Sequence, residues 1–181
     1  MLALLELLFE KEQVCEVLGD RRQQQETIDR LLATLEPMGD RPELIVAYTR
    51  QAELLGAAGQ FDEGERRLDQ ALALSRRLDD RGGERDTLRS KSFLFWLQRR
   101  GEEALDAVDR ALALDRDSGD PDRIAGDLTN RGAILRSLGR FDEAIMSLEE
   151  AIRVTAPESG AGDLSRHVEA LYVLHTIYRD R

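Results

Sequence analysis

Few side chains in this sequence could carry out chemistry, and those few are isolated from one another. The chain contains two histidines, His167 and His175, and one cysteine, Cys15. A metal site needs several ligands at a defined spacing, and a nucleophilic cysteine needs a neighbouring base. Neither pattern accompanies these residues, and the glycines mark helix ends and crossings rather than a phosphate-binding loop. We therefore expect no enzymatic activity, no catalytic residues, no metal and no cofactor.

The dominant feature of the chain is a repeat of 40 residues. Ala71-Leu72-Ala73-Leu74 recurs as Ala111-Leu112-Ala113-Leu114, and Gly59 recurs as Gly139. A fixed period of this length is typical of a solenoid, in which one supersecondary unit stacks on the next. The period predicts a single repeat domain over residues 1–181, with units 1–38, 39–78, 79–118 and 119–158 and a half unit or capping helix at 163–181.

Each unit has the pattern of two helices. Asp40-Arg41-Pro42-Glu43 places a capping aspartate before a first-turn proline, and Asp120-Pro121 repeats this start. Apolar residues then recur at three-to-four spacing as far as Gly59, a residue type that ends helices readily. The pattern predicts antiparallel pairs formed by helices over residues 43–57, 61–77, 84–98, 102–116, 123–138 and 142–154.

Small residues occupy fixed places in these helices. Ala52, Ser92 and Gly132 share one position in the first helix of their units, which lets the paired helices approach closely. With the run Gly139-Arg140-Phe141-Asp142-Glu143-Ala144, these positions make the chain resemble the tetratricopeptide repeat family, in the 40-residue variant of kinesin light chains, Rap-type and MalT-like regulators. HEAT-type repeats share the length but do not account for the Gly-x-Phe or the small positions.

The resemblance implies an all-α fold, a right-handed α-solenoid. In this fold, the first helix of each repeat lines a concave groove.

Two parts of the sequence depart from the repeat. The first unit carries Glu12 at a small-residue position and Arg21 where two other units have phenylalanine, so it is degenerate or a cap. Near the other end, residues 174–178 resemble the end of a fifth first helix, shifted by three residues through the loop at 160–162. A first helix without its second is a cap or the mark of a truncated array, and truncation is the reading that we favour.

Charge and composition narrow the partners. The formal net charge of −10 disfavours nucleic acid and anionic membranes. The single cysteine cannot form an internal disulfide, which fits a reducing compartment. Residues 1–9 are rich in leucine, but they carry Glu6 and lack a basic n-region, so they do not resemble a signal peptide. We expect a cytoplasmic protein.

The third unit differs from the others along the expected groove. It holds Arg89, Phe93, Trp96 and Leu97, whereas the second unit holds Thr49 and Glu53 and the fourth holds Thr129 and Arg136 at groove positions. Large aromatic residues at helical spacing on an exposed arc are typical of an anchor for a peptide. The alternative is structural: Trp96 covers the turn beside Arg99 and Arg100, or the third unit packs irregularly.

These observations favour a non-catalytic scaffold or regulatory module that binds a peptide or helix of a partner protein in the groove. The alternative is a ligand- or partner-sensing segment of a larger signalling ATPase or transcription regulator; an active site built across repeats is remote. The N-terminal helix is apolar around nearly its whole circumference, which suggests an apolar patch that is covered either by a second copy in a homodimer or by a preceding repeat. Its apolar residues are Leu2, Leu4, Leu5, Leu7, Leu8 and Phe9.

Overall fold

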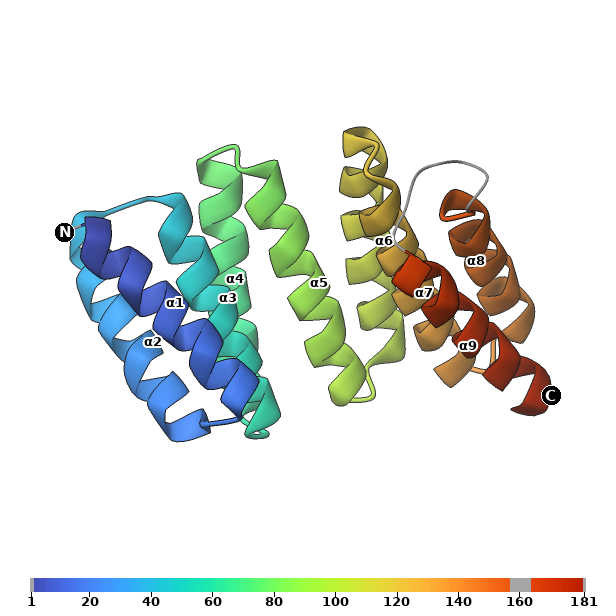
Figure 1. The fold of residues 1–181 in the computed structure, drawn as a ribbon, viewed down its shortest axis with the longest axis horizontal. Helices are drawn as coiled ribbons and strands as arrows, with labels where there is room; N and C mark the ends of the chain where they lie inside the picture. Colours follow the sequence, from blue (N-terminus) through green and yellow to red (C-terminus); the bar gives the residue numbers. More distant parts are fainter. Residues whose placement is uncertain (1, 157–163, 181) are drawn as a thin grey trace. The chain divides into compact units, whose positions relative to one another are not determined.

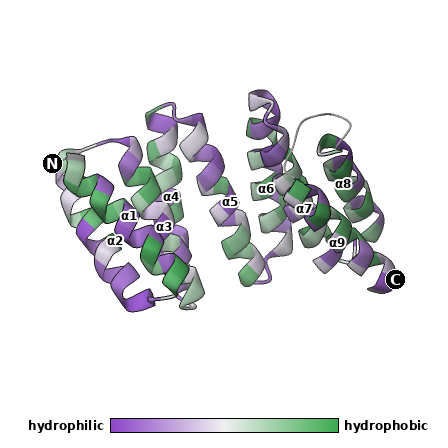
Figure 2. Cartoon of the chain, in the orientation of Figure 1, coloured by the Kyte–Doolittle hydropathy of each residue, from purple (hydrophilic) through white to green (hydrophobic). Residues whose placement is uncertain are grey.

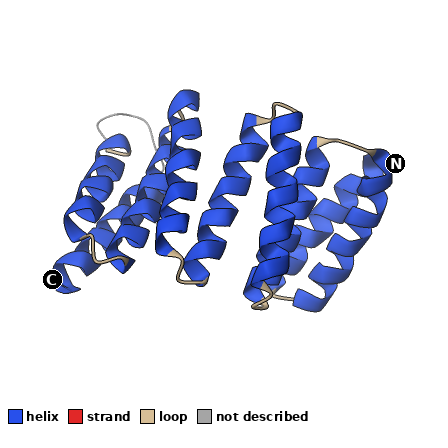
Figure 3. Ribbon diagram, turned by 180° about the vertical axis from the view of Figure 1, so that it is seen from behind, coloured by secondary structure: helices blue, strands red, loops and turns tan. Residues whose placement is uncertain are grey.

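The computed structural model describes residues 2–156 and 164–180, and these contain helices and turns but no strand (Figures 1 and 3). Successive α-helices run in opposite directions, which confirms the predicted all-α fold of antiparallel helix pairs. The loop at 160–162, on which the shifted fifth unit depended, lies outside the described residues. The helices are α1 (Leu2–Leu18), α2 (Arg21–Leu35), η1 (Glu36–Met38), α3 (Pro42–Ala57), α4 (Phe61–Arg77), α5 (Arg81–Leu97), α6 (Gly101–Ser118), α7 (Pro121–Ser137), α8 (Phe141–Val154) and α9 (Leu164–Asp180).

The chain forms two compact units, Met1–Ser90 and Lys91–Arg181, and the division falls within α5. The core of the first unit contains Ile28, Leu31 and Leu35 of α2 with Ile45 of α3. The second unit has its own core, in which Leu128 and Leu135 of α7 pack with Leu148 of α8. Figure 2 shows the mixture of hydrophobic and hydrophilic residues along each helix that such one-sided packing requires. The single repeat domain remains a prediction.

The six predicted helices are present, and each boundary lies within three residues of its expected place. The largest difference is the start of α5, at Arg81 rather than residue 84. The carboxylate of Asp80 accepts a hydrogen bond from the Gly83 N–H at 2.9 Å, so it caps a helix that begins before the two glycines.

Helix capping corrects one prediction and supports another. Asp120 caps α7, and its carboxylate accepts hydrogen bonds from the N–H groups of Asp122 and Arg123 at 3.1 and 3.3 Å. Asp40 does not cap α3, because the N-cap residue is the extended Arg41. The Asp40 carboxylate instead accepts a hydrogen bond from Nη2 of Arg77 at 2.7 Å.

The close crossing within the helix pairs follows the predicted small residues. A Cβ atom on Gly132 would lie 2.7 Å from Cγ of Leu148, so α7 and α8 require glycine there. Ser92 is buried at the equivalent position and donates a hydrogen bond to the Ala104 carbonyl at 2.8 Å. The first helix pair has Glu12 instead of a small residue at this position. Glu12 is buried there and accepts a hydrogen bond from Gln24.

One face of α1 is exposed and apolar. Leu5 and Leu8 are buried against α2, whereas Leu7 and Val14 are exposed. Position 7 corresponds to Thr87 of the third repeat, which lies 3.4 Å from Thr49 of the preceding repeat. The exposed stripe is therefore the face that contacts a preceding repeat elsewhere in the chain. We call it the α1 stripe; its large exposed residues are Leu4, Leu7, Val14, Val17 and Leu18.

The last described helix, α9, exposes the face that in α7 packs against the second helix of the pair. Ala170 and Ile177 are buried in the core of the second unit. Leu171 and Tyr178 are exposed, although their counterparts under the three-residue shift, Leu128 and Leu135, are buried in the α7–α8 pair. This is the pattern expected of a first helix without a second helix against it.

No helix in the described part of the chain is long and apolar enough to cross a membrane.

The turn between α5 and α6 holds a residue in a costly conformation. Arg99 has a φ of 60°, and the equivalent residues in neighbouring repeats, Gly59 and Gly139, both have a φ of 76°. A side chain is disfavoured in this left-handed region.

We expect Arg99→Gly to raise the free energy of unfolding by about 0.5–1 kcal/mol in urea denaturation followed by circular dichroism. Relief of backbone strain in the folded state exceeds the cost of the extra conformational entropy that glycine gives the unfolded chain. Arg99→Ala, which keeps a Cβ atom, is the control; an equal gain from alanine would contradict the explanation.

Candidate functional site

Three large apolar side chains on α5 form an exposed patch. Phe93 is 56% exposed, Trp96 43% and Leu97 36%. The Phe93 and Trp96 rings stack, with centroids 5.9 Å apart and planes inclined by 26°. The two rings therefore present one continuous aromatic surface, which we call the α5 patch (Phe93, Trp96 and Leu97).

The α5 patch lies beside the buried face of the helix. Leu94 and Phe95, between its members, are buried and fill the contact with neighbouring helices. The turn that follows is covered by other groups, because the Arg100 guanidinium lies over the Phe95 ring at 4.2 Å and donates to Glu103 at 2.7 Å. The hydrogen bond from Arg100 lowers the pKa of the Glu103 carboxyl. Trp96 itself stacks on Phe93.

The other predicted groove residues differ in accessibility. Thr49 and Thr129 are buried, and their hydroxyls donate to the carbonyls of Ile45 and Ala125 at 2.9 and 2.8 Å. Both threonines contribute to packing and offer little surface for a partner. The residues with accessible side chains are Glu53, Arg89 and Arg136, of which Glu53 is exposed and the two arginines are half-buried.

Glu53 belongs to a charged cluster in the first unit. Nη1 of Arg50 lies 3.2 Å from the Glu53 carboxylate and 3.3 Å from that of Glu16, and Ser90 donates to Glu53 at 2.7 Å. Burial alone would lower the pKa of the Arg50 guanidinium, but the carboxylates of Glu53, Glu16 and Glu12 outweigh it and raise the pKa. Arg89 of α5 has a partner of its own, since its Nη1 lies 3.7 Å from the Asp86 carboxylate.

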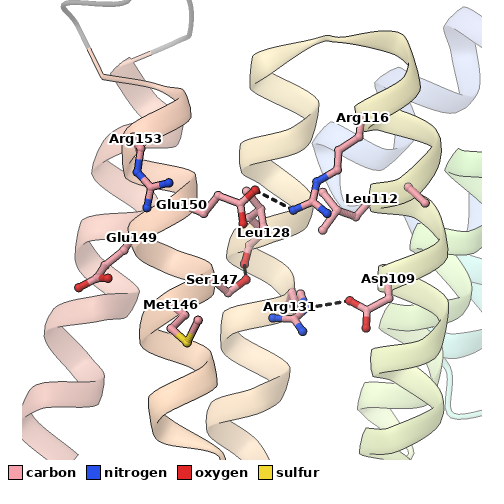
Figure 4. A pocket seen from close by; sticks show the side chains of 11 residues that line it. Asp109, Leu112, Arg116, Leu128, Arg131, Met146, Ser147, Glu149, Glu150 and Arg153 are labelled. Carbon is pink, nitrogen blue, oxygen red and sulfur yellow. Dashed lines mark hydrogen bonds and ion pairs between the residues drawn. The ribbon is translucent and has the colours of Figure 1, made fainter.

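A pocket of about 560 Å³ lies in the second unit, between α6 and α8 with α7 as its floor (Figure 4). Nη2 of Arg116 lies 2.7 Å from the Glu150 carboxylate, and Nε of Arg131 lies 2.7 Å from that of Asp109. Leu112 of α6 and Leu128 of α7 supply the apolar part of the lining. The lining charges balance, with three arginines facing three carboxylates: Arg116, Arg131, Arg153, Asp109, Glu149 and Glu150.

Sequence reasoning missed this pocket because it considered only the first helix of each repeat. Alternating charge along second helices is the usual pattern of a solvated face, so the arginines and carboxylates gave no separate signal. Met146 could have given one: it is exposed on α8 and takes the position held by Asp106 in the preceding repeat. Arg116 and Arg131 already form ion pairs with Glu150 and Asp109, so an anion that bound either arginine would have to displace a carboxylate.

The isolated histidines and cysteine are not assembled into a chemical site. Nδ1 of His167 lies 3.3 Å from the Thr155 hydroxyl, Cys15 is buried, and His175 is exposed on α9. Within residues 2–156 and 164–180, no group of three or more histidine, cysteine, aspartate or glutamate residues could hold a metal.

A family model decides the classification. The tetratricopeptide repeat model matches residues 43–117 and 85–156, which together span more than half of the chain. The chain belongs to the tetratricopeptide repeat family. This confirms the resemblance inferred from the 40-residue period.

Solved structures agree with this tetratricopeptide repeat fold. BtubC (BKLC) from P. vanneervenii superposes with a TM-score of 0.82 at 20% identity, over 98% of this chain and 72% of that one. A putative kinesin light chain from Podosopora anserina with nearly identical TPR-like repeats gives a TM-score of 0.80 at 14% identity, over 97% and 85%. A signal transduction ATPase with a tetratricopeptide repeat sensor, from Pyrococcus horikoshii, gives 0.80 at 19%, over 97% of this chain and 28% of that one. No curated protein matches the sequence.

The exposure of Trp96 predicts how the protein tolerates its loss. Trp96→Ala should reduce the free energy of unfolding by about 2 kcal/mol, because 43% of the residue is already exposed. Phe95→Ala is the matched comparison on the same helix, and we expect it to cost about 3–5 kcal/mol because Phe95 is buried. Urea denaturation followed by circular dichroism measures both; a Trp96→Ala loss as large as that of Phe95→Ala would assign Trp96 to the core.

Proposed function

We propose that this chain is a non-catalytic protein-interaction module that binds a peptide or helix of a partner protein through the α5 patch. The tetratricopeptide repeat is a protein-interaction fold, and the observation that supports this site is the exposed stack of Phe93 and Trp96. Of the other predicted groove residues, Glu53, Arg89 and Arg136 have accessible side chains and remain candidates for contact with a partner. The net charge of −10 makes nucleic acid and anionic membranes unfavourable partners, and a cytoplasmic location remains our expectation.

The physical case rests on how aromatic anchors bind. Tryptophan and phenylalanine bury large areas with few rotatable bonds, so little conformational entropy is lost when a partner covers them. The Phe93–Trp96 stack orders both rings before binding. An amphipathic helix or an extended segment with apolar residues at matching spacing would bury the patch.

Peptide selection tests the proposal directly. Peptides selected from a random library against the wild-type protein should shift the emission of Trp96, which is the only tryptophan of the chain. Trp96→Ala should weaken their binding by about 2 kcal/mol or more, which is about thirtyfold, as measured by fluorescence anisotropy of the labelled peptides. Met146→Ala, which removes an exposed apolar side chain outside the patch, should leave the affinity unchanged. Selected peptides that bind Trp96→Ala and Phe93→Ala as well as they bind the wild type would refute the site.

A second candidate function is a sensing segment of a larger signalling ATPase or regulator. It is supported by the likeness to the sensor-bearing ATPase of Pyrococcus horikoshii, of which this chain matches 28%. A sensor has to change conformation when it binds its ligand or partner, whereas an interaction module can bind its partner without changing conformation. Hydrogen–deuterium exchange with a selected peptide separates the two: protection confined to the neighbourhood of Trp96 supports the module, and altered exchange in distant helices of either unit supports the sensor.

We also propose self-association through the α1 stripe. Mutating Leu8 would not test it, since Leu8 is buried against α2, so the informative residues are Leu7 and Val14. We expect the wild-type chain to form dimers at micromolar concentration in sedimentation velocity, and Leu7→Glu with Val14→Glu to be monomeric, because charges oppose burial of the stripe. Tyr172→Glu alters an exposed residue on α9 and is the control. A monomeric wild type, or a dimer lost only in Tyr172→Glu, would contradict the assignment.

A further inference from the structure

A second, smaller pocket of about 250 Å³ lies in the first compact unit, where α2 begins and α3 ends. Leu54, Leu55, Ala57 and Ala58 form an apolar wall along the end of α3. Arg21, the first residue of α2, is the only charged residue in the lining, which the amide side chains of Gln25 and Gln60 complete. The pocket thus combines one fixed positive charge with an aliphatic surface.

The pocket exists because two residues depart from the repeat at the same place. In the second unit, Leu138 fills the equivalent space: a Cβ atom on Gly101 would lie 2.6 Å from its Cδ2 atom. The counterparts of Leu138 and Gly101 in the first unit are Ala58 and Arg21. The alanine side chain is too short to fill the space. Arg21 takes the first position of its helix, which is a glycine in α6 and a phenylalanine in α4 and α8. The result is a hollow with a charged group at its edge.

Buried groups hold Arg21 in position. Nη1 of Arg21 donates to Oε1 of Gln24 at 2.7 Å, and Nε2 of Gln24 donates to Oε1 of Glu12 at 2.6 Å. Gln24 is 3% exposed and Glu12 is 1% exposed, so the contact that orients the guanidinium is itself fixed in the core. The other oxygen of Glu12 lies 3.9 Å from Nε of Arg50. Glu12 breaks the small-residue pattern of the helix crossing, and by holding Gln24 it fixes the group that orients Arg21.

The guanidinium retains capacity to bind an anion. Gln24 uses one of its five N–H donors, and among the described residues no carboxylate forms an ion pair with it. A carboxylate can accept two parallel N–H bonds from the planar guanidinium, and such charge-assisted bonds are the strong ones. A phosphate would need further positive groups, which this lining does not provide. The aliphatic wall in turn favours a short apolar group next to the carboxylate.

We infer that this pocket is a binding site for a carboxylate carried on a short branched aliphatic group. The carboxylate binds Arg21, with the Gln25 and Gln60 amides within the same lining, and the aliphatic part packs on Leu54, Leu55 and Ala58. The volume suits a single small ligand, since it falls below the range of about 300–1,000 Å³ typical of drug-sized sites. The site is independent of the α5 patch, because its lining lies wholly within residues 21–60.

Titration with 4-methylpentanoate, followed by the amide NMR spectra of the protein, tests the site. We expect saturable shifts at Leu54, Leu55, Ala57 and Ala58, and none with 4-methylpentanamide, which lacks the charge. Arg21→Gln should weaken binding by about tenfold or more, because it removes the charge-assisted bonds. The matched control is Arg22→Gln, which alters the neighbouring arginine outside the pocket; Arg22 is paired with Glu26 at 3.1 Å.

Filling the pocket gives a second variant that keeps the charge. Ala58→Leu supplies the side chain that Leu138 provides in the second unit, so we expect it to abolish binding and to leave the circular dichroism spectrum and thermal stability intact. Equal weakening by Arg21→Gln and Arg22→Gln, or undiminished binding by Ala58→Leu, would overturn the proposal. So would the absence of saturable shifts at millimolar acid.

The source of the carboxylate is distinguished by a peptide that ends in leucine. Shifts of the same residues by Gly-Ser-Gly-Leu with a free carboxyl end, but not by its amide, would show that the pocket accepts a chain end. Binding of 4-methylpentanoate alone would assign a free acid. Either result supports the site, and binding of neither probe overturns it. Because Trp96 lies outside the pocket, failure here leaves the α5 patch untested, and failure of peptide selection leaves this site intact.

Discussion

The close approach of the two helices in each pair is the constraint on which the rest of the structure depends. Glycine at position 132 admits Leu148 to a distance at which a Cβ atom would clash, and Ser92 at the same position of α5 bonds directly to the Ala104 carbonyl of α6. Large residues beside the crossing can then fill the seam at native packing density. Positions in the seam are consequently fixed by packing, and they leave little freedom for function.

The first repeat meets the same constraint with polar groups. Glu12 is too large for a close crossing between apolar surfaces, and it is tolerated because Gln24 donates to it and Arg50 lies nearby. A buried carboxylate without such partners would be strongly destabilising. The degenerate appearance of the first repeat in the sequence therefore reflects a satisfied hydrogen-bonded arrangement rather than loss of the fold. Through Gln24, this arrangement also orients Arg21.

The helices and the family could be predicted from the sequence because each depends on local or periodic signals. Caps were less certain: Asp120 caps α7, but at Asp40 an ion pair with Arg77 replaces the cap, and the sequence does not reveal a residue 37 positions away as the partner. The predicted groove positions include Trp96, which is exposed, but they also include Thr49 and Thr129, which are buried. Helical periodicity gives the direction of a side chain around one helix, whereas burial depends on the neighbouring repeat. The Arg21 pocket escaped prediction for the same reason, because Arg21 and Ala58 become neighbours only through stacking.

Departures from the repeat are therefore the informative positions in this chain, and they are of two kinds. The third repeat has an excess, since Phe93, Trp96 and Leu97 exceed what the seam can bury, and the surplus becomes surface. The junction of the first and second repeats has a deficit, since Ala58 and Arg21 leave unfilled the space that Leu138 occupies elsewhere. An excess favours a partner that covers it, and a deficit favours a ligand that fills it. Because stacked repeats tolerate both changes without loss of the helix pairs, one scaffold can carry two unrelated sites, and each site can change without disturbing the other.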